Sequence, residues 1–431
     1  MLWYDFFVTR GVVIINIDIG DLIKYERLRQ GMKQITLSKG ICSISYLSKI
    51  ENNSTKASSE VIKLLLNRLN INLEDLMYSM EKEVEFTKEL ISIYKEITLN
   101  KNKEYAAKQL KYLLSKTTHY TGQTLFSLIL VITKLQLSLN KLKNCKKNIH
   151  FLNTKLPQLT KLQEYLLQKH EAIFFYKKKD IDKALNKLLK GYKTSKVVNI
   201  PDWEIADLDY CLGLVFSVSG QTHNSVSHTI KALEYFKNQF VYNRAVECYI
   251  LLGICYKEMK QYEKSLEIYS LALKIIEDLG MEHFRGKIYH NMGSIYAFSD
   301  STKAIESFKK SLEYKKTEQE KLITVLPIVE EYMKLEDWEN ANEWIESGFK
   351  LNSVTKDKFS YFYLTIYLQI SLNQFITEEE TLPVIQYFDS IKDYKNCYKV
   401  SLLLGDSLYK SGKYKSSANY YKKAHSYLKF M

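Results

Sequence analysis

The chain has 431 residues, a formal net charge of +13 and only 4 Pro. Leu, Lys, Glu, Ile and Tyr dominate, a mixture that favours helices, and the alternation typical of strands is scarce. No apolar run approaches the length of about 20 residues that spans a bilayer, and no phosphate-binding loop, nucleophile elbow or metal-spaced cluster occurs. We therefore expect an all-α, soluble, cytoplasmic protein of about two to four domains, with no enzymatic activity, no cofactor and no metal.

The net charge and the cysteines give only broad information. Residues 1–80 hold ten Lys/Arg and eight Asp/Glu, so they contribute +2 and leave +11 for residues 81–431. We interpret this remainder as diffuse charge on solvated helices, which is weak evidence for nucleic acid by itself. None of the six cysteines forms a Cys-x-x-Cys pair or stands at zinc-ligand spacing from a His, so we expect buried, reduced thiols.

The first 16 residues, MLWYDFFVTRGVVIIN, are apolar but form a poor signal peptide. They lack a basic start and a small-residue cleavage site, and Asp5 and Arg10 interrupt them. We interpret residues 1–16 as an extension upstream of the native start.

Residues 17–78 contain short helical segments separated by stop signals. The segment IGDLIKYERLRQG ends at Gly31 and KQITLSKG ends at Gly40, and a Gly just past the last apolar residue typically stops a helix. Ser43 is a good N-cap for a third helix, SSEVIKLLLNRLN is a fourth with its own serine caps, and NLEDLMYSM is a fifth. Two short helices joined by a tight turn in such a bundle predict a helix-turn-helix domain, followed by a linker over residues 79–86.

The third of these helices has two different faces. At 100° per residue, Leu47 and Ile50 lie on one side as core anchors, and Ser45 and Lys49 lie on the opposite side. Hydroxyls and a lysine can donate to base edges and phosphates, and Ile44 can meet a thymine methyl. The alternative interpretation is that the serines are only caps and solvated surface.

The stretch GMKQITLSKGICSISYLSKIENN resembles the helix-turn-helix of the XRE (Cro/C1-like repressor) class. Between Gln34 and Leu47 the chain is one residue shorter than most members of that class, a form similar to the peptide-sensing regulators of the PlcR and NprR type. The resemblance implies that Gln34 contacts backbone phosphate and that residues of the third helix carry most recognition contacts. The candidate DNA-binding residues are Gln34, Ser43, Ile44, Ser45, Tyr46 and Lys49.

The rest of the chain has an internal period of 40 residues. Gly213, Gly253 and Gly293 stand in the similar frames CLGLVF, LLGICY and NMGSIY, and an aromatic residue follows three positions after each. Ser225 and Ser265 stand twelve positions after the first two glycines, and the C-terminal segment fits the same spacing. Small residues at these positions let the two helices of a pair approach closely.

This pattern resembles the tetratricopeptide repeat (TPR), whose helix pairs stack into a right-handed superhelix. We expect about seven to nine pairs over residues 87–431. The concave face of a TPR array commonly binds extended peptides, and Asn291 occupies the position, two before the Gly, where TPR clamps often place an Asn. The interpretation of any one candidate as an ordinary surface residue remains open. The candidate peptide-binding residues are Asn291, His290, Lys287, Ser294, Lys257, Tyr210 and Asp207.

One helix-turn-helix followed by a TPR array resembles the RRNPP family of peptide-responsive regulators, and the nearest type is NprR. The resemblance implies a cytoplasmic quorum-sensing transcription regulator that binds a two-fold DNA operator as a homodimer or higher homo-oligomer and is switched by a short signalling peptide. Two alternatives stay open. One is a Rap-like TPR protein that binds and inhibits a phosphorelay response regulator. The other is a TPR adaptor whose helix-turn-helix domain is non-functional.

Overall fold

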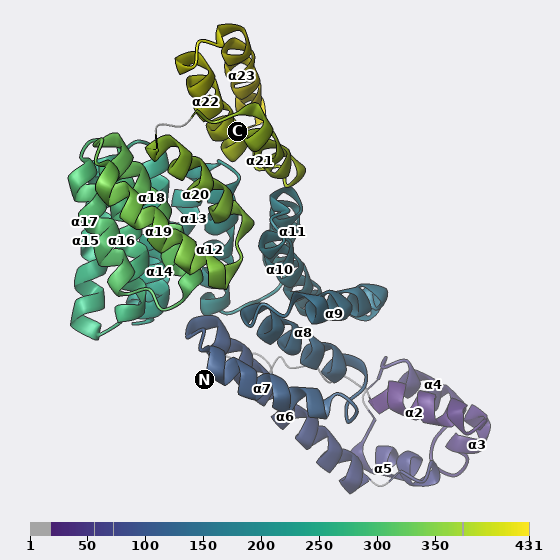
Figure 1. The fold of residues 1–431 in the computed structure, drawn as a ribbon. Coiled ribbons are helices and arrows are strands. Elements are labelled where there is room, and N and C mark those ends of the chain that lie inside the picture. The colour runs from purple at the N-terminus through teal and green to yellow at the C-terminus, as the bar shows by residue number, and fades with distance from the viewer. Residues whose placement is uncertain (1–18, 56, 72, 373–374, 431) are drawn as a thin grey trace. The chain divides into compact units, whose positions relative to one another are not determined.

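The computed structural model describes residues 19–430 except 56, 72 and 373–374, so the expected extension over residues 1–16 lies outside the described residues. Within them the protein is helical and contains no strand, as the composition predicts (Figure 1). None of its described helices is long and apolar enough to cross a membrane.

Four short helices and the start of a long one form the N-terminal bundle: α2 (Ile19–Arg29), α3 (Gln34–Ser38), α4 (Ile44–Glu51), α5 (Ser59–Arg68) and α6 (Leu73–Leu99). Apolar side chains of α2 to α5 and of the residue after α5 meet in one core. Its buried members are Ile23, Leu37, Leu47, Ile50, Leu65, Leu66 and Leu69.

The predicted stop and cap residues act as expected. Gly31 and Gly40 have φ of 65° and 73°, the left-handed region that favours glycine. The Ser43 hydroxyl accepts a hydrogen bond from the Tyr46 backbone N–H at 3.1 Å, and Ser58 does the same for Val61 at 3.4 Å. Local sequence signals therefore define the bounds of α4 and α5.

The linker expected over residues 79–86 lies inside α6. This helix contains no Gly or Pro between Leu73 and Leu99, so nothing in the sequence interrupts it. The expected fifth helix and the first helix of the array are thus one continuous element.

Among the described residues, seventeen α-helices follow α6, joined by short connections. They are α7 (Lys103–Lys116), α8 (Gly122–Ser138), α9 (Leu142–Thr154), α10 (Lys161–Lys177), α11 (Ile181–Ser195), α12 (Asp202–Val218), α13 (Thr222–Asn238), α14 (Tyr242–Glu258), α15 (Tyr262–Leu279), α16 (Arg285–Tyr296), α17 (Ser301–Glu313), α18 (Glu318–Lys334), α19 (Trp338–Thr355), α20 (Lys358–Ser371), α21 (Glu378–Ser390), α22 (Tyr394–Lys410) and α23 (Tyr414–Tyr427). From α6 to α23 they can be grouped into nine successive pairs.

The glycines of the 40-residue period lie where helices approach closely. A Cβ added to Gly213 of α12 would lie 2.3 Å from the Thr229 Oγ1 atom of α13, and one added to Gly405 would lie 2.8 Å from the Tyr421 ring. The Ser225 hydroxyl donates to the Gly213 carbonyl at 2.7 Å. The Gly and the Ser twelve residues later are therefore joined by a hydrogen bond between the two helices of a pair. Ser417 and Gly405 form the same bond at 2.8 Å.

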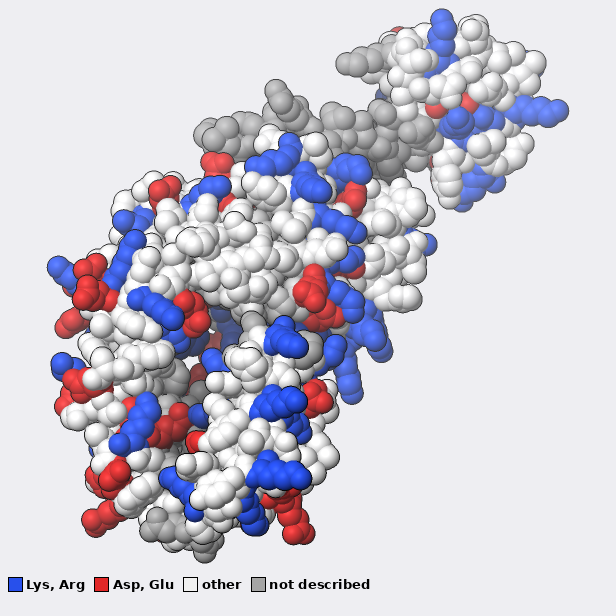
Figure 2. Space-filling model, turned by 90° about the horizontal axis from the view of Figure 1, so that it is seen from above, with Lys and Arg blue, Asp and Glu red and all other residues white. Residues whose placement is uncertain are grey.

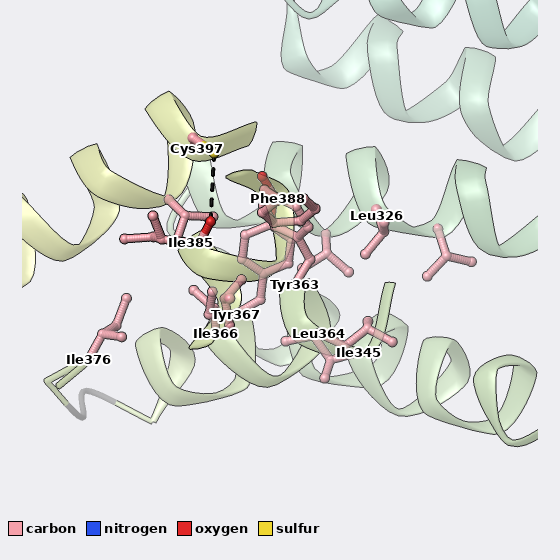
Figure 3. Packing of buried hydrophobic residues seen from close by; sticks show 14 of the residues in the cluster. Leu326, Ile345, Tyr363, Leu364, Ile366, Tyr367, Ile376, Ile385, Phe388 and Cys397 are labelled. Atoms are coloured by element: carbon pink, nitrogen blue, oxygen red, sulfur yellow. Dashed lines mark hydrogen bonds between the residues drawn. The ribbon is translucent and has the colours of Figure 1, made fainter. Parts of the chain in front are cut away.

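Backbone contacts divide the chain into two compact units, with the boundary between Cys255 and Tyr256. The second unit has a large apolar core from α18 to α22 and the C-terminal end of α23. In Figure 3, Tyr363 and Tyr367 of α20 lie beside Phe388 of α21, and the Cys397 thiol of α22 donates to the Ile385 carbonyl at 3.7 Å.

None of the six cysteines forms a disulfide, and all except the half-buried Cys42 are buried. Burial raises the pKa of the Cys145 thiol to about 12, and the same cause raises that of Cys248 to about 12. These thiols stay protonated and pack as small apolar side chains.

Candidate nucleic-acid interface and groove sites

Helix α4 presents a polar face opposite its buried face. Leu47 and Ile50 are buried in the core of the bundle, which turns Ser45 and Lys49 toward solvent. Ile44 is 46% exposed. Ile44, Ser45 and Lys49 therefore form a small exposed set that can contact base edges and phosphates.

The other two candidates on and before α4 have structural contacts. The exposed Ser43 side chain caps the helix, and the half-buried Tyr46 packs against the bundle core. Ser43 keeps a free lone pair and a hydroxyl proton for a phosphate, whereas only part of Tyr46 is accessible.

Gln34 makes a contact within the bundle. Its side-chain amide donates to the Glu51 carboxylate at 2.7 Å, and Arg27 holds the same carboxylate with two further bonds of 2.6 and 2.9 Å. Burial alone would raise the pKa of Glu51, but the hydrogen bonds from Arg27 and Gln34 outweigh it and lower that pKa. Gln34 thus joins α3 to α4 through one amide proton, and its expected contact with a phosphate stays a prediction.

Two of the groove candidates, Asp207 and Tyr210 of α12, belong to a charged network in the first unit. The Asp207 carboxylate lies 2.6 Å from Lys169 Nζ, 2.6 Å from an Arg244 guanidinium nitrogen and 3.5 Å from Lys134 Nζ. Burial would raise the pKa of Asp207, but these three cations lower it well below its usual range. Asp207 is thus buried and paired with three cations, and its expected contact with a peptide stays a prediction.

A cavity of about 310 Å³ adjoins this network. Tyr210 lies on its wall with its ring beneath the Arg244 guanidinium at 4.4 Å. The wall is rich in positive charge, and Asp207 is its one carboxylate. The cationic wall residues are Lys101, Lys103, Lys134, Lys177 and Arg244. Such a cavity suits an anionic group, because the lining has more cations than the carboxylate neutralises.

The remaining candidates lie in the second unit. On α16, His290 is half-buried and its Nδ1 lies 3.0 Å from the Thr324 hydroxyl. Burial, together with Lys315 and Lys257, lowers the pKa of His290 to about 4. Ser294 donates to the His290 carbonyl at 3.0 Å, so its hydroxyl supports its own helix.

Asn291 is half-buried, and its side-chain amide has no hydrogen-bond partner among the residues that the structure describes. Lys287 is exposed, and Lys257 lies 3.5 Å from the neighbouring Glu258. Asn291 is therefore the candidate on α16 whose amide is most available to a peptide backbone.

A larger cavity of about 680 Å³ in the second unit lies among α18, α20 and α22. Glu330 accepts hydrogen bonds from both the Tyr367 hydroxyl and the Lys399 ammonium group at its wall. The 40-residue period does not indicate Glu330 or Tyr367. These two lie outside the repeat positions, and only their meeting in space reveals them.

A short two-helix turn with an exposed polar second helix, followed by helix pairs with Gly-to-Ser close approaches, defines a helix-turn-helix protein with a TPR array. The model of the Helix-turn-helix family matches residues 23–76, and that of the Tetratricopeptide repeat family matches residues 248–317.

Curated relatives include a transcriptional activator and a response regulator phosphatase. The transcriptional activator NprA of Geobacillus stearothermophilus is 29% identical over 416 residues, which cover 92% of this chain and 99% of NprA. The response regulator aspartate phosphatase H of Bacillus subtilis is 24% identical over 55% of this chain and 64% of its own length.

Solved structures share the fold. The apo form of the quorum sensor NprR from B. thuringiensis superposes with a TM-score of 0.66 and 18% identity, over 80% of this chain and 99% of NprR. A Rap protein complexed with competence and sporulation factor gives a TM-score of 0.67 and 17% identity, over 81% and 98% of the two chains. These matches agree with the resemblance to the RRNPP family that the motifs of the sequence carry.

Proposed function

We propose that this protein is a cytoplasmic quorum-sensing transcription regulator, which binds DNA through α4 and is switched by a short signalling peptide bound by its TPR array. The observation that carries the proposal is the match to a transcriptional activator over nearly the whole of both chains. The exposed polar face of α4 supports it, because Ser45, Lys49 and Ile44 are the groups that a recognition helix needs.

A homodimer on a two-fold operator is part of this proposal. One recognition helix of eight residues offers few base contacts, so two heads on two half-sites are needed for tight and specific binding. Peptide binding would then act by favouring one arrangement or one oligomeric state of the two heads.

DNA binding is tested by the double variant Ser45→Ala, Lys49→Ala with DNA from upstream of neighbouring genes. The matched control is Ser59→Ala, Lys63→Ala, an exposed Ser and Lys at the same spacing on α5. We expect the α4 variant to lose specific binding by about 10-fold or more in a salt-titrated assay and the α5 variant to keep it. Equal affinities for the two variants would refute the α4 interface.

Peptide binding is tested with a short synthetic peptide taken from a small secreted-peptide gene beside this one. Asn291→Ala should weaken binding in calorimetry, because a buried backbone group of the peptide loses its partner. Asn238→Ala, at the exposed end of α13, should leave the affinity unchanged. An unchanged affinity for Asn291→Ala removes this residue from the site.

A second function, binding of a phosphorelay response regulator, is favoured by the match to aspartate phosphatase H over 55% of the chain. It is tested by following phosphate release from a phosphorylated response regulator of the same cell. Release in the presence of this protein would establish an activity that the sequence motifs did not indicate, and binding without release would support inhibition alone.

A further inference from the structure

The excess positive charge of the protein is concentrated in one short part of the chain. Residues 141–196 contain fifteen Lys and four Asp/Glu, a net charge of +11 against +13 for the whole protein. The expectation of charge diffused over residues 81–431 is therefore wrong. Over much of the face in Figure 2, basic and acidic side chains lie close together, whereas α9 contains no acidic residue at all.

The basic residues of α9 form a stripe on its outer face. Lys143, Lys146, Lys147 and His150 follow the spacing i, i+3, i+4, i+7 and span about 100° of the helix. All four are exposed, and no described residue forms an ion pair with any of the three lysines. The opposite side of α9 is anchored in the core by Cys145, Ile149 and Leu152.

Helix α11 carries a second basic stripe beside the first. Lys183, Lys187 and Lys190 follow the spacing i, i+4, i+7 and span about 60° of the helix. Lys183 and Lys190 are exposed, and Lys187 is half-buried. Glu171 of α10 joins the two helices, since its carboxylate accepts from Asn153 of α9 at 2.9 Å and lies 2.5 Å from Lys187 of α11. Both stripes thus flank the same residue of α10.

The stripes lie among few acids. Asp180 pairs with Lys183 at 2.7 Å, and Glu164 pairs with Lys161 at 2.8 Å. None of the seven stripe residues is apolar. Protein interfaces are depleted in lysine and depend on buried aromatic or apolar anchors, whereas phosphate contacts with nucleic acid need only positioned cations.

We propose that the stripes on α9 and α11 bind the phosphate backbone of double-stranded DNA and add sequence-independent affinity to the contacts of α4. This inference rests on the proposed function. It also answers a need of that function, because the exposed set on α4 supplies a single cation, Lys49, and phosphate contacts provide a large share of protein–DNA affinity.

The test uses the full-length protein and the triple variant Lys143→Gln, Lys146→Gln, Lys147→Gln, in which glutamine keeps the helix propensity. The control triple variant Lys413→Gln, Lys415→Gln, Lys422→Gln removes the same charge from exposed positions in and before α23. Affinity is measured against salt concentration for a specific DNA fragment and for an unrelated fragment of equal length.

We expect the slope of log K against log salt to become shallower by up to about 3 in the α9 variant, at about 0.9 for each lost phosphate contact. Affinity for both fragments should fall together, and the control should match the wild type. This differs from the α4 variant, which loses only specific binding.

Equal slopes for the α9 variant and the wild type would overturn the inference while leaving the α4 interface intact. Equal weakening by both triple variants would also overturn it, because the effect would then be one of net charge. Unchanged DNA binding with lost binding of an acidic response regulator would assign the stripes to a protein partner. Absence of DNA binding by the wild type would refute the inference and the proposed function together.

Discussion

Asp207 joins four helices through ion pairs. A carboxylate that neutralises three buried cations holds α8, α10, α12 and α14 together, since Lys134, Lys169 and Arg244 come from the other three helices. Sequence alone could not show this, because the three partners lie 73, 38 and 37 residues away and no local pattern connects them.

Removing the Asp207 charge should therefore destabilise the protein strongly. We expect Asp207→Asn to lower the free energy of unfolding by up to about 3–5 kcal/mol, because Lys134 loses its carboxylate partner and Lys169 and Arg244 each keep only one, Glu204 and Glu247. Urea denaturation followed by circular dichroism measures the loss. Asp182→Asn, at an exposed position of α11, should change stability by less than about 0.5 kcal/mol. Equal stability of the two variants would show that the network does not depend on Asp207.

His290 should make stability depend on pH. Its pKa is about 4 in the folded protein against 6.5 when unperturbed, so the unfolded chain binds more protons between these values. The free energy of unfolding should fall as pH drops from about 6.5 toward 4, by at most about 3 kcal/mol. His290→Gln should remove most of this dependence, as measured by urea denaturation at several pH values. If the variant keeps the pH dependence of the wild type, groups other than His290 cause that dependence.

The six DNA-binding candidates show which features of a site can be predicted from sequence. Helical projection separated Ser45 and Lys49 from Leu47 and Ile50, and the structure gives the same division. The resemblance implies a phosphate contact for Gln34, and it did not indicate that the Gln34 amide joins α3 to α4. Periodicity predicts which face is exposed, whereas hydrogen bonds between elements depend on their packing.

At the scale of elements, the 40-residue period was the most informative part of the sequence. Gly213 and Ser225, like Gly405 and Ser417, stand twelve residues apart because the hydroxyl of one helix reaches the carbonyl of its partner. The linker was predicted where the helix in fact continues. Residues 79–86 contain helix-favouring residues, and α6 runs through them without a break.

The close approach at Gly293 should not tolerate a side chain. A Cβ there would lie 2.7 Å from the Phe308 ring of α17, so Gly293→Ala should lower the free energy of unfolding by about 1–3 kcal/mol. Gly191→Ala is the control, because its Cβ would meet nothing closer than 3.7 Å and alanine favours the helix by up to about 1 kcal/mol. Thermal unfolding should rank the control at or above the wild type, and the opposite order would contradict this packing.

At the scale of the whole molecule, the proposed switch is a coupling between two ligands. If the peptide raises or lowers the DNA affinity by some factor, DNA must change the peptide affinity by the same factor. We expect calorimetric titrations of peptide, with and without saturating operator DNA, to reproduce the factor found in DNA titrations. An equal peptide affinity with and without operator DNA would show that the peptide does not act on DNA binding at equilibrium.

The distribution of cysteines has a practical consequence for such experiments. Five thiols are buried, and burial raises the pKa of Cys145, Cys211, Cys248 and Cys397 to between about 11 and 12, so few of them ionise near neutral pH. Cys42, between α3 and α4, is half-buried and therefore the most accessible. A maleimide dye added to the native protein should attach there first. The unaltered chain thus provides one labelling position next to the proposed recognition helix. The fluorescence of a dye at this position would change when DNA binds.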